Sequence, residues 1–179
     1  MKEGMNFVCF LLLVCLFISC SSGRKVTASQ VSFADNIVVA HRGAWKKNNL
    51  PENSIASLKE AIRLKCTGAE FDVRMTADDS LIINHDRDYN KMWIEQTTYA
   101  ELEKFKLSNG EKLPTLREYI LAGIENNTAT RLVCEIKPSA SKERGKIIAE
   151  KVYHLVNELK AQSKVVYISF DYDILKKIV

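Results

Sequence analysis

The sequence lacks the features that would assign it to several common functional classes. Its 26 Lys and Arg residues exceed its 22 Asp and Glu residues by only four, and they are spread along the chain rather than gathered into a basic stripe. Nucleic-acid-binding proteins usually carry such a stripe, so we expect no nucleic-acid partner. The 179 residues contain no internal repeat and no low-complexity segment, and their number suits a single domain.

Two further absences concern ligands. No glycine-rich loop follows the first predicted strand, so a nucleotide-binding α/β sheet has no local support. No cluster of Cys and His offers the soft ligands that a zinc site favours. A ligand site in this chain is therefore expected to use oxygen and imidazole groups from residues that lie apart in the sequence.

The N-terminus carries a short apolar run over residues 7–18, preceded by Lys2. A membrane-spanning helix needs about 20 apolar residues, so this run is more typical of a signal peptide. The run ends in Ser-Cys, which resembles a bacterial lipobox and implies cleavage before Cys20 with lipid on its thiol. We expect a signal peptide over 1–19, then a lipidated Cys20 and tether over 20–36. The alternatives are an ordinary cleaved signal peptide or an uncleaved anchor.

This N-terminal pattern predicts an exported protein, either a membrane-anchored lipoprotein or a periplasmic protein. The membrane would then be a partner through the lipid anchor alone. Residues 37–179 form the predicted domain.

Strand and helix patterns alternate through this domain. Short β-branched or alternating runs predict strands at 37–40, 69–75, 81–83, 131–136 and 165–170. Apolar residues at helical spacing predict helices at 55–66, 99–105, 116–126, 142–159 and from 172 onward. This alternation predicts an α/β fold with a parallel sheet, either an open doubly wound sheet or a (β/α)8 barrel. Both architectures place functional residues at the C-terminal ends of the strands.

Reactive side chains occur at four successive predicted strand ends. They are His41 and Arg42, then Glu70 and Asp72, then His85, and finally Glu135 and Lys137. Strand side chains alternate between faces, so Glu70 and Asp72 share one face, as do Glu135 and Lys137. One acidic residue or one His at a strand end is usually a solvated loop residue. The prediction of a site rests on the repetition at four strand ends.

The chemistry of these residues points to a metal and a phosphate. Three carboxylates brought together need a counterion, and Ca²⁺ or Mg²⁺ prefers carboxylate oxygen. Histidine has an unperturbed pKa near neutral pH and is suited to general acid and base work. Arg42 offers a guanidinium group that can donate two parallel hydrogen bonds to a phosphate, and Lys137 offers a compact positive charge.

Several motifs, in this order, resemble those of the glycerophosphodiester phosphodiesterase family. The first is Ala-His-Arg-Gly-Ala-Trp with the Pro-Glu-Asn-Ser that follows, in residues 40–54. The others are Gly-Ala-Glu-Phe-Asp-Val-Arg-Met-Thr at 68–76, Asn-His-Asp at 84–86, Leu-Pro-Thr-Leu at 113–116, Cys-Glu-Ile-Lys at 134–137 and Ile-Ser-Phe at 168–170. The resemblance runs from about residue 37 to the last residue.

The resemblance implies a TIM-type barrel that hydrolyses glycerophosphodiesters to glycerol 3-phosphate and an alcohol. By the same likeness, Glu70, Asp72 and Glu135 hold a divalent cation, Ca²⁺ or Mg²⁺. His41 and His85 are then the acid–base pair. Arg42 and Lys137 contact phosphate, while Glu52 and Asn53 orient the site.

A complete barrel of this type has eight strands in about 250 residues, whereas about five strands are predicted here. We therefore expect an incomplete barrel, the N-terminal part of a phosphodiesterase domain. We expect these residues alone to have low activity, although the candidate catalytic residues are all present. Alternative functions on the same barrel are a phosphatidylinositol phospholipase C-like or a sphingomyelinase D-like activity. A non-catalytic surface lipoprotein is the alternative from another class.

We also expect Cys66 and Cys134 to lie too far apart for a disulfide.

Overall fold

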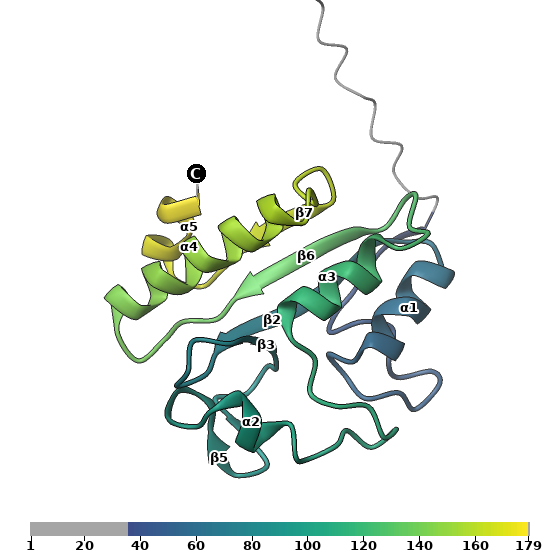
Figure 1. Ribbon diagram of the computed structural model, residues 1–179. Helices are drawn as coiled ribbons and strands as arrows, with labels where there is room; N and C mark the ends of the chain where they lie inside the picture. The colour runs from purple at the N-terminus through teal and green to yellow at the C-terminus, as the bar shows by residue number, and fades with distance from the viewer. Residues whose placement is uncertain (1–35, 179) are drawn as a thin grey trace, which may run out of the picture. The chain divides into compact units, whose positions relative to one another are not determined.

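The computed structural model describes residues 36–178, so the predicted signal peptide, Cys20 and almost all of the tether lie outside the described residues. A five-stranded sheet forms the centre of the described part (Figure 1). Its strands are β1 (Asn36–Ala40), β2 (Cys66–Met75), β3 (Leu81–Ile83), β6 (Arg131–Ile136) and β7 (Val165–Ile168). Four of them are parallel, in the order β1-β2-β6-β7, and β3 pairs with β2.

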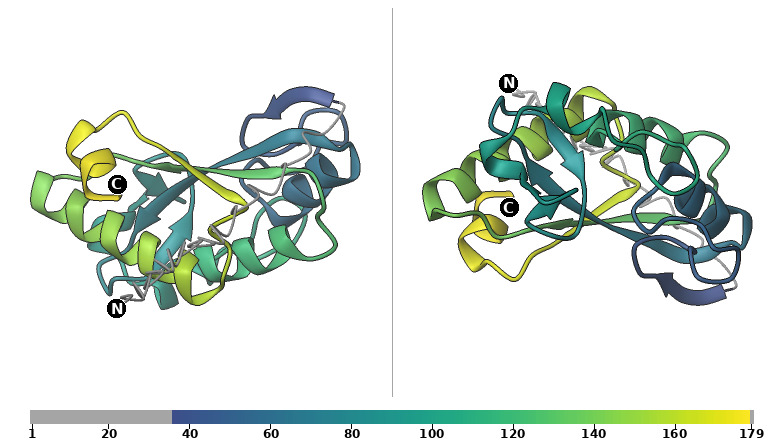
Figure 2. Two further views of the ribbon diagram at one scale, coloured as in Figure 1. Left: turned by 90° about the horizontal axis from the view of Figure 1, so that it is seen from above. Right: turned by 90° about the horizontal axis from the view of Figure 1, so that it is seen from below.

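Four helices of seven residues or more pack around this sheet, and Figure 2 shows the sheet and helices from two further directions. They are α1 (Ile55–Arg63), α3 (Leu116–Ile124), α4 (Lys142–Glu158) and α5 (Tyr172–Ile178). A smaller layer contains the hairpin β4 (Asp88–Tyr89) and β5 (Met92–Trp93), the 3₁₀ turn η1 (Ile94–Gln96) and α2 (Tyr99–Leu102). No helix between residues 36 and 178 is long and apolar enough to cross a membrane.

The main core lies between the sheet and these helices. Phe71 and Cys134 point from β2 and β6 into it, and both are fully buried. The Phe71 ring contacts that of Tyr119 on α3, with centroids 4.6 Å apart. Since successive strand residues face opposite sides, this packing turns Glu70, Asp72 and Glu135 to the other face.

The helix starts follow from local sequence. Ser54, Thr115 and Ser141 cap α1, α3 and α4, and each side chain accepts a hydrogen bond from a backbone N–H three residues later. The predicted end of the first helix was wrong. The helix stops at Arg63, Lys65 adopts a left-handed conformation with φ of 52°, and Cys66 already begins β2.

The direction of β3 also differs from the parallel arrangement that the alternation predicted. β3 runs antiparallel to β2, with Met75 opposite Leu81. A parallel pair needs a crossover of a dozen or more residues, whereas the turn 76–80 between these strands is far shorter. The parallel sheet of the described part therefore has four strands, and β3 pairs with the C-terminal part of β2.

Cys66 and Cys134 are both free and buried. The strand register places Phe71 opposite Cys134, so Cys66 lies five residues away along β2. At about 3.3 Å per residue this is roughly 16 Å, well beyond the Cα separation of about 7 Å that a disulfide allows. The geometry agrees with the expected separation of the two thiols.

Candidate active site at the C-terminal ends of the strands

Three buried carboxylates meet on one face of the sheet. Asp72 on β2 lies opposite Glu135 on β6, and Glu70 lies two residues before Asp72 on the same strand. Each of the three offers an oxygen atom within 4.8 Å of the oxygens of the other two. The predicted convergence of Glu70, Asp72 and Glu135 is therefore confirmed.

The electrostatics of this carboxylate cluster fit a bound cation. Glu70 Oε1 and Asp72 Oδ1 are buried and accept no hydrogen bond in the described part of the chain. Burial is the main cause that raises the pKa of Glu70 to about 7, and the charges of Asp72 and Glu135 add to it. Buried carboxylate oxygens without donors are the ligands that Ca²⁺ and Mg²⁺ prefer.

Lys137 lies against the same cluster. Its Nζ is 2.8 Å from Glu135 Oε1 and 3.2 Å from Asp72 Oδ1, and its side chain is almost fully buried. One ammonium group balances only part of the charge of three carboxylates. The sequence predicted Lys137 at this edge, and the structure adds that it is paired with two of the carboxylates.

The turn after β1 brings a second positive group to the cluster. The backbone N–H of Arg42 donates to Glu70 Oε2 at 2.8 Å, and its Nη1 donates to both oxygens of Glu52 at 2.9 and 3.0 Å. Arg42 Nε lies 3.8 Å from Asp72 Oδ2. Gly43 has φ of 79°, and a Cβ there would lie 2.7 Å from the backbone carbonyl carbon of Ser57, so this tight turn requires glycine.

Asn53 fixes the orientation of Asp72. Its Nδ2 donates to Asp72 Oδ2 at 2.8 Å, and its Oδ1 accepts the backbone N–H of Asp72 at 3.2 Å. The backbone N–H of Asn53 donates to the Arg42 carbonyl at 2.9 Å. These contacts agree with the expectation that Glu52 and Asn53 orient the site, since one holds Arg42 and the other holds Asp72.

The two candidate acid–base residues differ in their surroundings. His41 Nε2 lies 3.8 Å from Glu70 Oε2, while 67% of the His41 side chain is exposed. His85 Nδ1 lies 2.8 Å from Asp86 Oδ1, and this contact is the main cause that lowers the pKa of Asp86. A carboxylate on one ring nitrogen orients the imidazole and leaves the other nitrogen free for substrate.

Arg74 is a positioning residue to which the sequence analysis gave no role. Its side chain is buried, and its Nε and Nη2 donate to the backbone carbonyl of His85 at 2.9 and 2.7 Å. The sequence did carry a signal for this role. Residues two apart on a strand share one face, so Arg74 lies on the same face as Glu70 and Asp72. Its guanidinium holds the loop that carries His85.

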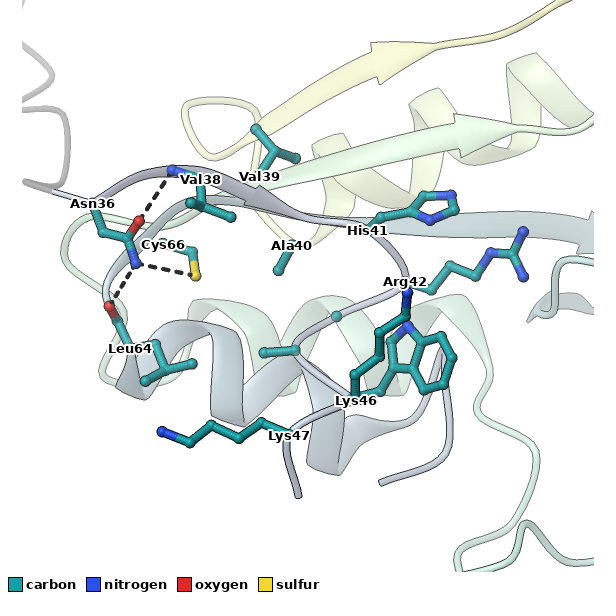
Figure 3. Close-up of a pocket in the computed structure, with 13 residues that line it drawn as sticks. Asn36, Val38, Val39, Ala40, His41, Arg42, Lys46, Lys47, Leu64 and Cys66 are labelled. Atoms are coloured by element: carbon teal, nitrogen blue, oxygen red, sulfur yellow. Dashed lines mark hydrogen bonds between the residues drawn. The ribbon is translucent and has the colours of Figure 1, made fainter. Parts of the chain in front are cut away.

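A cavity of about 570 Å³ lies along β1 and reaches His41 and Arg42 (Figure 3). In Figure 3 the His41 and Arg42 side chains extend beyond the end of β1, and the Asn36 amide donates to the Leu64 carbonyl at 3.4 Å at the other end. None of the three clustered carboxylates lines this cavity. The candidate site is therefore built around the carboxylate cluster and does not coincide with this cavity.

Four parallel strands with an acidic cluster at their C-terminal ends define part of a TIM-type (β/α) barrel with its site in the position usual for barrel enzymes. A model of the glycerophosphoryl diester phosphodiesterase family matches residues 41–179. The chain belongs to this family.

Relatives in sequence agree with this assignment. A glycerophosphodiester phosphodiesterase from Caldanaerobacter subterraneus subsp. tengcongensis is 30% identical over 155 residues, which cover 79% of this chain and 61% of the relative. One from Bacillus altitudinis is 28% identical over 144 residues, 74% of this chain and 57% of the relative. The chain thus spans about three fifths of the length of these relatives.

Solved structures support the incomplete barrel that the sequence predicted. A glycerophosphodiester phosphodiesterase from Parabacteroides distasonis has a TM-score of 0.76 and 38% identity, over 82% of this chain and 61% of that one. An Oleispira antarctica phosphodiesterase has a TM-score of 0.67 at 22% identity, over 80% and 61% of the two chains, and shows the likeness of fold alone.

The cluster predicts a pH-dependent response of stability to divalent cations. The folded-state pKa of Glu70, about 7, is above its ordinary value of 4.5. Without a cation, the free energy of unfolding should therefore fall as pH rises from about 4.5 to 7, by up to about 3 kcal/mol.

A cation that binds the ionised cluster offsets this loss, so 5 mM Ca²⁺ or Mg²⁺ should raise Tm by several degrees at pH 8, on the order of 5–10 °C. The rise should be smaller at pH 5.5, and differential scanning fluorimetry in EDTA and in each cation measures both. An equal rise at both pH values would contradict the prediction.

Proposed function

We propose that the protein hydrolyses glycerophosphodiesters to glycerol 3-phosphate and an alcohol with the help of a divalent cation, Ca²⁺ or Mg²⁺. The observation that carries the proposal is the cluster of Glu70, Asp72 and Glu135. Glu70 Oε1 is buried without a donor, and Asp72 Oδ1 has the Lys137 ammonium group 3.2 Å away but no hydrogen bond. Membership of the family and the names of its relatives support the reaction class.

Glu70, Asp72 and Glu135 would hold the cation. A bound cation would polarise a phosphoryl oxygen and offset the negative charge of the transition state. Asn53 keeps Asp72 in place through its two hydrogen bonds. The backbone N–H of Arg42 fixes one Glu70 oxygen and leaves the other, Oε1, free for the cation.

His41 and His85 divide the proton transfers in this proposal. One imidazole removes a proton from the nucleophile, which is water or the glycerol hydroxyl of the substrate, and the other protonates the oxygen of the departing alcohol. If the glycerol hydroxyl attacks, water then opens the resulting cyclic phosphate to give glycerol 3-phosphate. Asp86 and Arg74 hold the ring and the backbone of His85, respectively. His41 stands next to Glu70, within 3.8 Å, and can therefore serve a substrate bound at the cluster.

Arg42 and Lys137 would contact the phosphate. Each is already paired with carboxylates, Arg42 with Glu52 and Lys137 with Glu135 and Asp72. The Lys137 ammonium group has three N–H donors, so it can contact a phosphate oxygen beside the cluster as well as its carboxylate partners. The guanidinium of Arg42 has the fork geometry that phosphate oxygens accept.

The direct test of the proposal is turnover of a glycerophosphodiester with and without the cation. Release of glycerol 3-phosphate from glycerophosphoglycerol, measured with a coupled dehydrogenase, should fall to background after dialysis against EDTA. Addition of Ca²⁺ or Mg²⁺ in excess of EDTA should restore it, and the better ion identifies the preferred cation. Full turnover in EDTA, with the metal content verified as zero, would refute the role given to the carboxylate cluster.

We further propose that the mature protein begins at Cys20 and is exported as a lipoprotein, with the membrane reached through its lipid anchor. The support is the apolar run that ends in Ser-Cys and the polar segment after it. Cys20→Ala should move the protein from the membrane fraction to the soluble fraction or block its processing, as read by immunoblot and intact mass. Cys66→Ala, at a buried cysteine of the domain, is the control and should leave the fractionation unchanged. A Cys20→Ala protein that is processed and retained at the membrane like the unchanged protein would reject the lipid anchor.

A further inference from the structure

The start of helix α1 is held by a side chain from a distant part of the sequence. Glu111, in the segment that links α2 to α3, accepts the backbone N–H of Ile55 at 3.0 Å through Oε2 and that of Ala56 at 3.2 Å through Oε1. In Figure 1 this segment passes below α1. Glu111 is not among the clustered carboxylates and has no part in the reaction proposed above.

Glu111 completes the hydrogen bonding at this helix end. The first four N–H groups of a helix have no partner inside the helix. Ser54 and Ser57 satisfy the outer two, because each hydroxyl oxygen accepts the backbone N–H of the other residue, at 3.0 and 3.2 Å. The two N–H groups between them belong to Ile55 and Ala56, and Glu111 accepts both. The positive end of the helix dipole also favours a carboxylate at this position.

The Glu111 carboxylate is itself held in place. Asn109 Nδ2 donates to Glu111 Oε1 at 2.8 Å, and the Glu111 N–H donates to Asn109 Oδ1 at 3.1 Å. The backbone N–H of Leu107 donates to the Glu111 carbonyl at 2.8 Å and closes this turn. Two residues later, Leu113 is buried in the small core beside Ile82 of β3. Glu111 therefore reaches α1 from a fixed base.

Asn53 needs support from the chain on both sides. Its φ of 57° is in the left-handed region, where a residue with a side chain is strained and persists only if its surroundings hold it. On one side, the Asn53 N–H donates to the Arg42 carbonyl at 2.9 Å. On the other side the chain enters α1 within two residues, at the end that Glu111 holds. The Asn53 amide makes both of the hydrogen bonds that orient Asp72, so a rotation of the Asn53 backbone would disturb them together.

We propose that Glu111 is a positioning residue of the candidate site. By holding the start of α1 it fixes Asn53, and through Asn53 it fixes the orientation of the Asp72 carboxylate for cation binding. The inference rests on the proposed function, because it assigns Asp72 to the cation site. A cap that only stabilised α1 would lower the free energy of unfolding and would leave cation binding by the folded protein unchanged.

The first test measures the affinity of the folded protein for the cation. Isothermal titration with calcium chloride or magnesium chloride should show about tenfold weaker binding by Glu111→Ala, the lower end of the cost of removing a group that orients a metal ligand. Glu111→Gln keeps one oxygen for one of the two N–H groups and should fall between Glu111→Ala and the unchanged protein. At saturating cation, kcat for glycerophosphoglycerol should stay within about threefold, because Glu111 does not touch the reacting atoms.

Two variants of α4 are matched controls for the lost cap and the lost charge. Ser141→Ala removes the side chain that caps α4, and it should lower Tm without weakening cation binding. Glu143→Ala removes an exposed negative charge from the first turn of α4. Both controls should bind the cation within about twofold of the unchanged protein.

The second test measures the contact between Asn53 and Asp72 without any cation. The Asp72 N–H donates to Asn53 Oδ1, whereas the Leu132 N–H on the neighbouring strand β6 donates to the Lys164 carbonyl. Hydrogen exchange followed by NMR in EDTA should be faster at Asp72 in Glu111→Ala, by about fivefold more than at Leu132. A loss of global stability alone, as expected for Ser141→Ala, would speed exchange at both amides equally.

The outcomes separate the inference from the proposed function. Cation affinity in Glu111→Ala within about twofold of the unchanged protein, or equal acceleration of exchange at Asp72 and Leu132, would overturn the role of Glu111. The same loss of affinity in Ser141→Ala or Glu143→Ala would also overturn it. If the unchanged protein bound neither cation and hydrolysed no diester, the proposed function would be refuted, and selective exchange at Asp72 would still show that Glu111 positions Asn53 and Asp72.

Discussion

His85→Ala is expected to lower kcat/KM for glycerophosphodiesters by about 10²–10⁴-fold, the usual contribution of a positioned general acid or base. His85 is not among the clustered carboxylates, so the variant should keep its stabilisation by divalent cations. Steady-state kinetics from pH 5 to 9 and thermal unfolding with and without cation measure these effects together.

His154→Ala is the matched control for that variant. His154 lies on α4, its ring packs against Tyr153 with centroids 5.9 Å apart, and it has no place in the candidate site. The control should change kcat/KM by less than twofold. If His85→Ala retained more than a tenth of the activity in a folded protein, the acid–base assignment would be wrong.

Glu70→Gln should lower activity and raise cation-free stability at the same time. Gln can still accept the Arg42 N–H through its oxygen, and its amide can donate toward Asp72 or Glu135 in place of the carboxylate oxygen that lacks a donor. We expect turnover to fall by about 10²–10³-fold or more, because a cation ligand is lost. At pH 8 in EDTA, the free energy of unfolding should rise by up to about 3 kcal/mol, because a group with a pKa of about 7 no longer ionises in the folded state.

The opposite signs make this variant informative. A merely structural role for Glu70 would make Glu70→Gln lose stability and activity together, and that outcome would reject the cluster as a cation site. Glu143→Gln is the matched control, because Glu143 is an exposed carboxylate on α4 away from the cluster. It should leave the response of Tm to the cation unchanged.

Much of the fold was predictable because its signals are local. Apolar spacing placed the starts of the helices at residues 55, 116 and 142, and in the structure Ser54, Thr115 and Ser141 cap those starts through contacts within one turn. The first helix was predicted to run to residue 66, with Gly68 as the stop signal after it. It ends earlier, at Arg63, because Lys65 adopts the left-handed conformation that glycine often adopts after a helix. Gly68 instead lies inside β2, where a Cβ would come within 3.0 Å of the Val133 side chain.

The direction of β3 was decided by the chain between the strands and not by its own residues. A run such as Leu-Ile-Ile has the same apolar pattern whether its neighbour is parallel or antiparallel. The short turn over 76–80, with Asp79 at φ of 64°, allows only the antiparallel return.

The sequence by itself determined which side chains converge at the site. Strand alternation is a local property, so the spacing of Glu70 and Asp72, and the position of Glu135 at the end of another strand, placed all three on one face before any packing was known. The tertiary structure alone decided how those groups are supported. Lys137 pairs with two carboxylates, Arg74 holds the His85 carbonyl, and Arg87 and Arg144 share one cavity. Arg87 and Arg144 come from distant parts of the chain. All three arrangements depend on how the strands and loops pack, and the spacing of residues in the sequence does not record that packing.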